Sequence, residues 1–256
     1  MSFLQSIILG IVQGFTEFLP ISSTGHLILV SDLLKIPQTE FVKSFEIAIQ
    51  LGSILAVVVL YWKTLVTKIE VLKKIAVAFL PTATLGLVFY KIVKTFLLGN
   101  EKVVVYSLLL GGIFLILFEY FYKEKTESAS ELENISLKQA FIIGLFQSVA
   151  MIPGVSRSAA TIIGGLFVGI KRKTIVEFSF LLAIPTMLAA TALDLLKSYQ
   201  EFSSGSLGVL SLGFLASFLV AILSIKFLLN FVKKHDFTVF GVYRILVAII
   251  FLVLVI

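Results

Sequence analysis

Residues 2–34 read SFLQSIILGIVQGFTEFLPISSTGHLILVSDLL. About 17 mostly apolar residues are followed by the helix breaker Pro20–Gly25 and then by about nine further residues. Nine helical residues rise only about 14 Å, which is half of a bilayer core. The segment can be one kinked span, but we favour a re-entrant helix–loop–helix, because irregular polar backbone is tolerated at membrane depth only where it is buried or lines a wet cavity.

A second segment, Leu137–Ile170, has the same form, with its breaker at Pro153–Ser158. Six other stretches have the roughly 20 apolar residues that a membrane-spanning helix needs. These stretches are 44–62, 75–97, 103–122, 174–196, 207–229 and 237–256. The sequence therefore predicts an all-α integral membrane protein, one domain over residues 1–256, with six transmembrane helices and two re-entrant hairpins.

The composition supports this class. Of the 256 residues, 59% are hydrophobic and 14% are charged, whereas soluble domains have about 45–50% apolar and about 25% charged residues. A soluble enzyme, a disordered chain and a nucleic-acid binder are thereby excluded, despite the net charge of +6. The chain has no cysteine, so it has no disulfide or thiolate metal site.

The two halves of the chain, 1–123 and 137–256, resemble each other weakly. Matching pairs are Gly10 with Gly144, Ser23 with Ser156 and Phe79 with Phe214. Each half holds one hairpin, which makes no net crossing, and three spans. Because three is odd, the halves must insert with opposite orientation, and such inverted repeats place their site near the midplane between them.

The basic residues indicate the orientation. Six lie on the side of the N-terminus: Lys35, Lys43, Lys91, Lys94, Lys102 and Lys197. Twelve lie on the other side: Lys63, Lys68, Lys73, Lys74, Lys123, Lys125, Lys138, Lys171, Arg172, Lys173, Lys233 and Lys234. The positive-inside rule puts the second group in the cytoplasm, so we expect both termini and the site to face the outside.

The first hairpin carries polar residues at membrane depth, where they are costly and usually functional. Gln13 and Glu17 are four residues apart and share one helix face. The alternative for this pair is a solvated helix end. The hydroxyls of Ser22 and Ser23 come next, and His26 follows in the next helix, where it is either a reactive group or a buried histidine with satisfied hydrogen bonds.

The second hairpin predicts an oxyanion cradle. Gly154 lets the backbone approach a ligand closely, and Ser156, Ser158 and the backbone N–H groups at a helix start can donate to an anion. Arg157 supplies a rigid fork that suits phosphate oxygens. The alternative is an arginine bonded to backbone carbonyls.

Three polar residues within the spans are further candidates for a supporting role. Arg244, in the last span, is either a second cationic contact or the partner of a carboxylate. Glu46 and Gln50 form another pair four residues apart, which either lines an outer vestibule or makes structural hydrogen bonds.

These residues carry a resemblance that covers the whole chain. Gln13–His26 strongly resembles the first signature of the undecaprenyl pyrophosphate phosphatase family, also called the bacitracin-resistance family. Pro153–Thr161 is similar to the second signature, Pro-Gly-x-Ser-Arg-Ser-x-x-Thr. Many members have Glu where this chain has Gln13, and an amide cannot act as a base.

The resemblance implies a phosphatase of the bacterial plasma membrane that removes the terminal phosphate of undecaprenyl diphosphate, so that the lipid carrier is reused in cell-wall synthesis. It implies that Arg157, with Ser22, Ser156 and Thr161, holds the phosphates. His26 is then nucleophile or general acid/base, with Ser23 as the rival nucleophile. Glu17 orients its partner, acts as base or binds Mg²⁺ or Ca²⁺.

The expected partners are the lipid substrate and membrane lipids, without nucleic acid, and a homodimer stays open. A transporter or flippase of an anionic polyprenyl phosphate is the alternative function, because inverted repeats with breaks at the midplane are typical of secondary transporters. The combination of Glu17, His26 and Arg157 favours chemistry, since transport of an anion needs no base.

Overall fold

A computed structural model of the chain describes all residues except 38, 93–96, 98–99, 125–127, 199–206 and 255–256. The secondary-structure elements of the described residues are helices, with one isolated bridge between Ala129 and Ile170. The first half contains α1 (Phe3–Thr16), α2 (Ser23–Leu33), α3 (Glu40–Leu60), α4 (Trp62–Thr67), α5 (Ile69–Ile92) and α6 (Glu101–Phe121). The second contains η2 (Leu132–Asn134), α7 (Leu137–Val149), α8 (Arg157–Phe167), α9 (Arg172–Ser198), α10 (Leu207–Phe231) and α11 (Thr238–Leu254).

Five described helices are long and apolar enough to cross a membrane. They lie at Phe41–Leu60, Ile69–Phe89, Glu101–Phe121, Arg172–Ala192 and Leu207–Phe231. The sixth expected stretch forms α11, whose 17 described residues give only about 26 Å of helix. The second stretch begins six residues earlier than expected, because the charged residues of 69–74 form the first turns of α5 instead of a loop.

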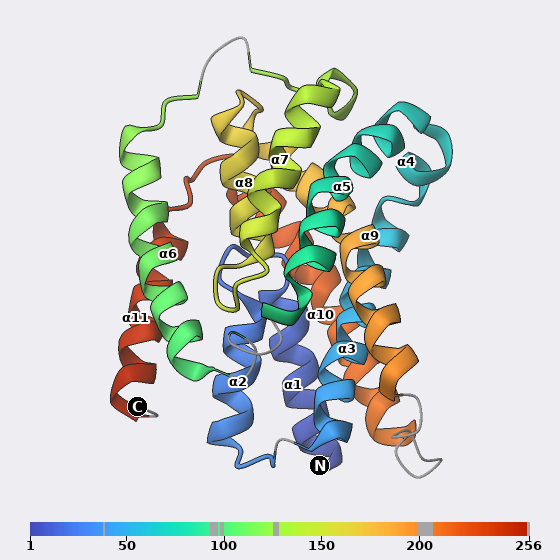
Figure 1. Ribbon diagram of the computed structural model, residues 1–256, viewed down its shortest axis with the longest axis vertical. Coiled ribbons are helices and arrows are strands. Elements are labelled where there is room, and N and C mark those ends of the chain that lie inside the picture. The colour runs from blue at the N-terminus through green and yellow to red at the C-terminus, as the bar shows by residue number, and fades with distance from the viewer. Residues whose placement is uncertain (38, 93–96, 98–99, 125–127, 199–206, 255–256) are drawn as a thin grey trace.

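Both broken segments fold as helix–break–helix (Figure 1). α1 rises from the lower end of the bundle in the view and α2 returns to it, while α7 descends from the upper end and α8 returns there. The two breaks therefore meet at about half height. α1 begins and α11 ends at the same, lower end of the bundle.

Each hairpin is closed by the same pair of contacts. Gln5 caps the start of α1 and also donates from Nε2 to the carbonyl of Leu34, 3.3 Å away at the end of α2. Gln139 caps α7 and donates in the same way to Val168 at 2.9 Å. Gln139 lies 134 positions after Gln5, and Val168 lies 134 positions after Leu34. The offset that relates the two halves in sequence therefore also relates equivalent contacts in the structure.

Each hairpin packs on a helix of the opposite half. α1 lies against α10, and α7 lies against α5. A Cβ on Gly10 would collide with the carbonyl oxygen of Gly213, and a Cβ on Gly144 would collide with that of Ala78. Glycine at these two positions lets the helix backbones approach closely, and the halves interlock.

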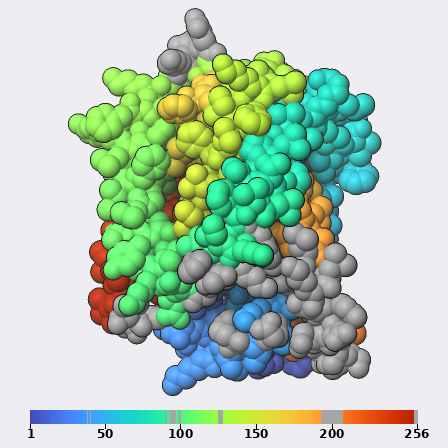
Figure 2. All heavy atoms as spheres, in the orientation of Figure 1, coloured from blue at the N-terminus to red at the C-terminus, as the bar shows by residue number. Residues whose placement is uncertain are grey.

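The second hairpin is also exposed on the side of the helix bundle. Figure 2 shows its yellow-green residues between α6 in green and α5 in teal. Phe141, Leu145 and Val149 are exposed on this hairpin. An apolar face of this kind suits contact with lipid chains rather than water.

Candidate active site

A cavity of about 190 Å³ lies where the two breaks meet. Glu17, Ser22, Ser23 and Thr24 line it from the first hairpin, and Gly154, Ser156 and Arg157 line it from the second. α3, α5 and α9 complete the wall, so residues far apart in sequence share one small volume.

Two helices begin at this cavity with the same unusual cap. Ser22 precedes α2 with φ 71°, and Ser156 precedes α8 with φ 78°. Each side chain accepts from a backbone N–H three residues later, at 3.4 Å for Ser22 and 3.2 Å for Ser156. Non-glycine residues at positive φ are strained and gather at functional sites. Two helix N-termini at one cavity give it a preference for anions.

These caps correct the match between the hairpins. The sequence comparison paired Ser23 with Ser156 across a one-residue gap. The structure instead gives Ser22 the same cap geometry as Ser156, so the offset of 134 holds through the break. Ser23 therefore corresponds to Arg157, the first residue of α8.

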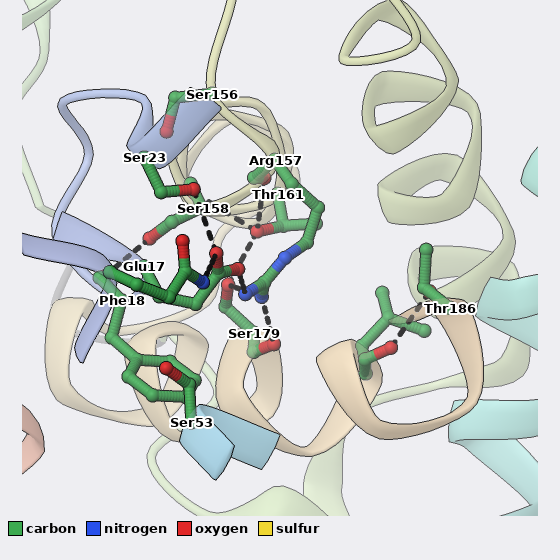
Figure 3. Close-up of polar contacts among 12 residues, drawn as sticks. Glu17, Phe18, Ser23, Ser53, Ser156, Arg157, Ser158, Thr161, Ser179 and Thr186 are labelled. Atoms are coloured by element: carbon green, nitrogen blue, oxygen red, sulfur yellow. Dashed lines mark hydrogen bonds and ion pairs between the residues drawn. The ribbon is translucent and has the colours of Figure 1, made fainter. Parts of the chain in front are cut away.

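Glu17 is the centre of the polar contacts in Figure 3. Ser23 Oγ donates to Glu17 Oε2 at 2.7 Å, and Gln13 Nε2 donates to the same oxygen at 2.9 Å. The Gln13 Oε1 atom is buried and has no hydrogen-bond partner among the described residues. Gln13 and Glu17 are both buried, so they are not a solvated helix end.

Arg157 joins the second hairpin to Glu17. Its Nη2 lies 2.9 Å from Glu17 Oε1, and its Nη1 donates to the Ser179 carbonyl at 2.8 Å. The Nε atom is buried and has no partner in the described part of the chain. The Glu17 carboxylate, the Ser179 carbonyl and the Ser179 hydroxyl, which is 3.4 Å from Nη1, therefore fix the guanidinium of Arg157, a residue that lines the cavity.

Ser158 and Thr161 were expected to contact the anion, but their hydroxyls bond to other groups of the protein. Ser158 Oγ donates to the Phe18 carbonyl at 2.7 Å, which ties the two hairpins together. The Thr161 hydroxyl lies 2.6 Å from Ser179 Oγ and 3.0 Å from the carbonyl of Arg157. Neither residue is among those that line the cavity, so both hold Arg157 and its loop in place instead of facing a ligand.

His26 lies outside the cavity lining. Its Nδ1 is 2.8 Å from the Ser22 carbonyl, and its Nε2 is 2.8 Å from the Tyr243 hydroxyl. A carbonyl only accepts, so Nδ1 carries the proton and Nε2 of the neutral ring accepts from Tyr243. The ring stacks on Tyr243 with centroids 5.5 Å apart. Both nitrogens are therefore engaged.

Arg244 was expected either to contact the phosphates or to pair with a carboxylate, and it contacts backbone carbonyls instead. It is completely buried, and its guanidinium donates to five backbone carbonyls. These belong to Pro20, Ser107, Leu108, Gly154 and Val155. Arg244 thus fixes both breaks against α6, where Gly111 leaves the space for its guanidinium.

Glu46 and Gln50 have different surroundings. Gln50 lines the cavity, whereas Glu46 accepts from Ser31 Oγ at 3.1 Å and lies outside the lining. The pair therefore does not act as a unit.

The sequence reasoning missed three cavity residues, Thr82, Gln147 and Thr186. Gln147 Nε2 donates to Thr82 Oγ1 at 2.8 Å and to Thr186 Oγ1 at 3.2 Å. Two signals were available. Gln147 is the repeat partner of Gln13, and each threonine follows a proline inside an apolar span, where proline frees backbone groups.

Comparison with known proteins gives a consistent result. Residues 6–250 match the model of the family described as bacitracin resistance protein BacA. The undecaprenyl-diphosphatase of Aquifex aeolicus is 54% identical over 96% of this chain and 96% of its own length. That of Persephonella marina is 51% identical over 100% of both chains, and that of Methanococcus aeolicus is 44% identical over 98% of both.

Proposed function

The chain belongs to the bacitracin resistance protein BacA family, and from this membership and the geometry of the cavity we propose that it is an undecaprenyl-diphosphate phosphatase. It is a multi-pass membrane protein that hydrolyses undecaprenyl diphosphate to undecaprenyl phosphate and inorganic phosphate, and so returns the lipid carrier to cell-wall synthesis. The observation that carries this function is the contact of Ser23 with Glu17 beside Arg157, at a cavity where two helices begin.

Ser23 is the nucleophile that this geometry favours. A serine hydroxyl needs an adjacent base, and Glu17 Oε2 is 2.7 Å away. Glu17 takes the proton as Ser23 Oγ attacks the terminal phosphorus, and the bond to the bridging oxygen breaks, with the electron pair leaving on undecaprenyl phosphate. Water then attacks the phosphorus of the phosphoserine, the bond from phosphorus to Ser23 Oγ breaks, and inorganic phosphate leaves with the protons of the water. Glu17 returns its proton to Ser23 Oγ, which restores the hydroxyl and the carboxylate. His26, whose nitrogens are both engaged, ranks below Ser23.

The cavity also supplies the charge neutralisation that phosphoryl transfer needs. Arg157 lines the cavity and brings its positive charge to the terminal phosphate. The N–H groups at the starts of α2 and α8 donate to the remaining equatorial oxygens. Because Ser22 and Ser156 cap these helices, their contribution is to hold the two starts in position.

His26 is a positioning residue in this proposal. Its Nδ1–H holds the Ser22 carbonyl at 2.8 Å, and Ser22 is the strained cap directly before Ser23. The Tyr243 hydroxyl keeps the ring in that orientation. Loss of the imidazole would release the cap and displace the nucleophile.

A divalent cation, Mg²⁺ or Ca²⁺, fits the donors of this cavity only together with substrate. No group of three or more His, Cys, Asp or Glu side chains lies close enough together to hold a metal among the described residues. Glu17 is the carboxylate among the residues that line the cavity, and the unpartnered Oε1 of its neighbour Gln13 is buried outside that lining. Mg²⁺ typically uses one or two carboxylates plus substrate phosphates. When bound, the ion would neutralise diphosphate charge.

For the topology we propose six spans, with α11 as a short one, and two re-entrant hairpins arranged as inverted repeats. The matched hairpin contacts and the crossed packing of α1 on α10 and α7 on α5 support the repeat. The uneven distribution of Lys and Arg supports an orientation in which both termini, and the opening of the site, face the outside of the plasma membrane.

A lipid flippase is the alternative, and the meeting of two broken hairpins at mid-height is the observation in its favour. Phosphate release from undecaprenyl diphosphate in detergent micelles separates the two functions, because a micelle has no two sides. The proposal expects release by the wild-type protein and none by Ser23→Ala. No release by correctly folded wild-type protein, with or without divalent cation, would contradict it.

A further inference from the structure

The cavity contains a second polar cluster that the chemistry at Ser23 does not use. Thr82, Gln147 and Thr186 come from α5, α7 and α9, are joined by the Gln147 amide, and all line the cavity. None of the three is charged. The Thr82 hydroxyl donates to the Gly144 carbonyl at 3.1 Å and the Thr186 hydroxyl donates to the Leu182 carbonyl at 2.8 Å. A ligand oxygen at the cluster would therefore accept from a hydroxyl that turns from its carbonyl toward the cavity, and such a neutral donor suits an oxygen that does not need a full counter-charge.

This cluster lies apart from the reacting groups. Thr186 and Ser179 are seven residues apart on α9, about two turns or 10 Å along one face. The Ser179 carbonyl accepts from Arg157, and Arg157 with Glu17 forms the charged end of the cavity lining. In Figure 3 Thr186 is likewise separated from Glu17, Ser23 and Arg157. The cavity thus has a charged end and a neutral end.

The exposed lining residues at the two ends of the cavity differ in polarity. Ala190 lies one turn beyond Thr186 on α9, and Ile152 follows the end of α7, the helix that carries Gln147; both are apolar, exposed residues of the lining. At the charged end the exposed lining residue is Thr24, a neighbour of Ser23. An amphiphilic ligand would therefore lie with its apolar part toward Ile152 and Ala190.

We propose that Thr82, Gln147 and Thr186 form the subsite for the lipid-linked phosphate, the leaving group, with the first part of the polyprenyl chain passing between Ile152 and Ala190. This inference rests on the proposed function. The terminal phosphate occupies the charged end because transfer requires neutralisation there. The neutral donors then hold the second phosphate as it takes the electron pair of the breaking bond. Undecaprenyl phosphate stays on this cluster, while inorganic phosphate leaves from the charged end.

Equilibrium binding tests this subsite without turnover. Dissociation constants for undecaprenyl phosphate and for inorganic phosphate are measured in detergent for the wild type, Thr82→Val and Thr186→Val. Both variants should bind the lipid phosphate about tenfold more weakly, because a hydrogen bond to a charged group is lost. Binding of inorganic phosphate should be unchanged, and Thr186→Ser, which keeps the hydroxyl, should restore lipid affinity.

Thr84→Val is the matched control. Thr84 lies two residues from Thr82 on α5, is exposed, bonds to the Leu80 carbonyl at 2.9 Å and does not line the cavity. It should change neither constant. Unchanged lipid binding in both test variants would overturn the subsite, as would an equal loss of both ligands that Thr186→Ser does not recover. A protein that binds lipid phosphate through these threonines but releases no phosphate from the diphosphate would refute the proposed function alone.

Discussion

Ser23 Oγ donates to Glu17 Oε2 across 2.7 Å, from the first residue of α2 to the residue that follows α1. The break of the first hairpin is what brings the two groups together. A continuous helix would place residues six apart on different faces, so the broken backbone is required for the pair. Arg157 of the other half then contacts the second Glu17 oxygen at 2.9 Å, and the pair becomes a triad that spans both halves.

Arg157→Lys should lower the rate of phosphate release by about 10²–10³-fold. Lysine keeps the charge but cannot contact Glu17, the Ser179 carbonyl and a phosphate together. Steady-state phosphate release in detergent measures the effect, with the Tm of the variant as the control for folding. Activity close to the wild type would show that Arg157 only steers the substrate.

Glu17→Gln should abolish turnover, whereas Gln13→Glu should be tolerated. Glu17 is the carboxylate that accepts from Ser23 and pairs with Arg157, while Gln13 contributes an amide whose Oε1 has no partner in the described part of the chain. Both variants are compared across a titration of Mg²⁺. Full activity of Glu17→Gln at saturating cation would exclude Glu17 as base and as an essential anionic ligand.

His26→Asn should retain part of the activity that His26→Ala loses. An asparagine amide can donate to the Ser22 carbonyl in place of Nδ1–H, whereas alanine leaves that carbonyl and the strained cap unsupported. The comparison of the two turnover rates is the measurement. If His26→Asn is as inactive as His26→Ala while both are folded, the imidazole itself takes part in the chemistry.

Single cysteines at Ser2 and Lys234 should be labelled from opposite sides of the membrane. The chain has no native cysteine, so an impermeant thiol reagent reports each position without background. Intact cells should be labelled at residue 2 and only permeabilised cells at residue 234, because the larger group of basic residues lies inside. Labelling of both from one side would exclude the proposed inverted repeat.

Much of the site could be predicted from the sequence, because polar residues in an apolar chain are conspicuous. Glu17, Ser23 and Arg157 were identifiable by type and by the breaks beside them, and the structure brings all three to one cavity. Thr82 and Thr186 were not identified, since a threonine in an apolar helix usually bonds the backbone of its own helix. Thr186 does donate to the Leu182 carbonyl of its own helix, and Thr82 donates to the Gly144 carbonyl of α7.

The roles of His26 and Arg244 could not be predicted because they depend on partners far along the chain. Tyr243 is 217 residues from His26, and the Pro20 carbonyl is 224 residues from Arg244. No local pattern encodes such contacts. The same applies to the register of the two hairpins, which the cap geometry of Ser22 and Ser156 reveals and the residue match alone did not.

The identity of the nucleophile is the central claim, and rapid quench with undecaprenyl diphosphate labelled in its terminal phosphate tests it most directly. We expect a transient labelled protein whose label is stable to acid, lies on Ser23 and is absent from Ser23→Ala. An acid-labile, base-stable label would indicate phosphohistidine at His26, and no labelled protein at any time during turnover would indicate direct attack by water. Either of these results would exclude Ser23 as the nucleophile.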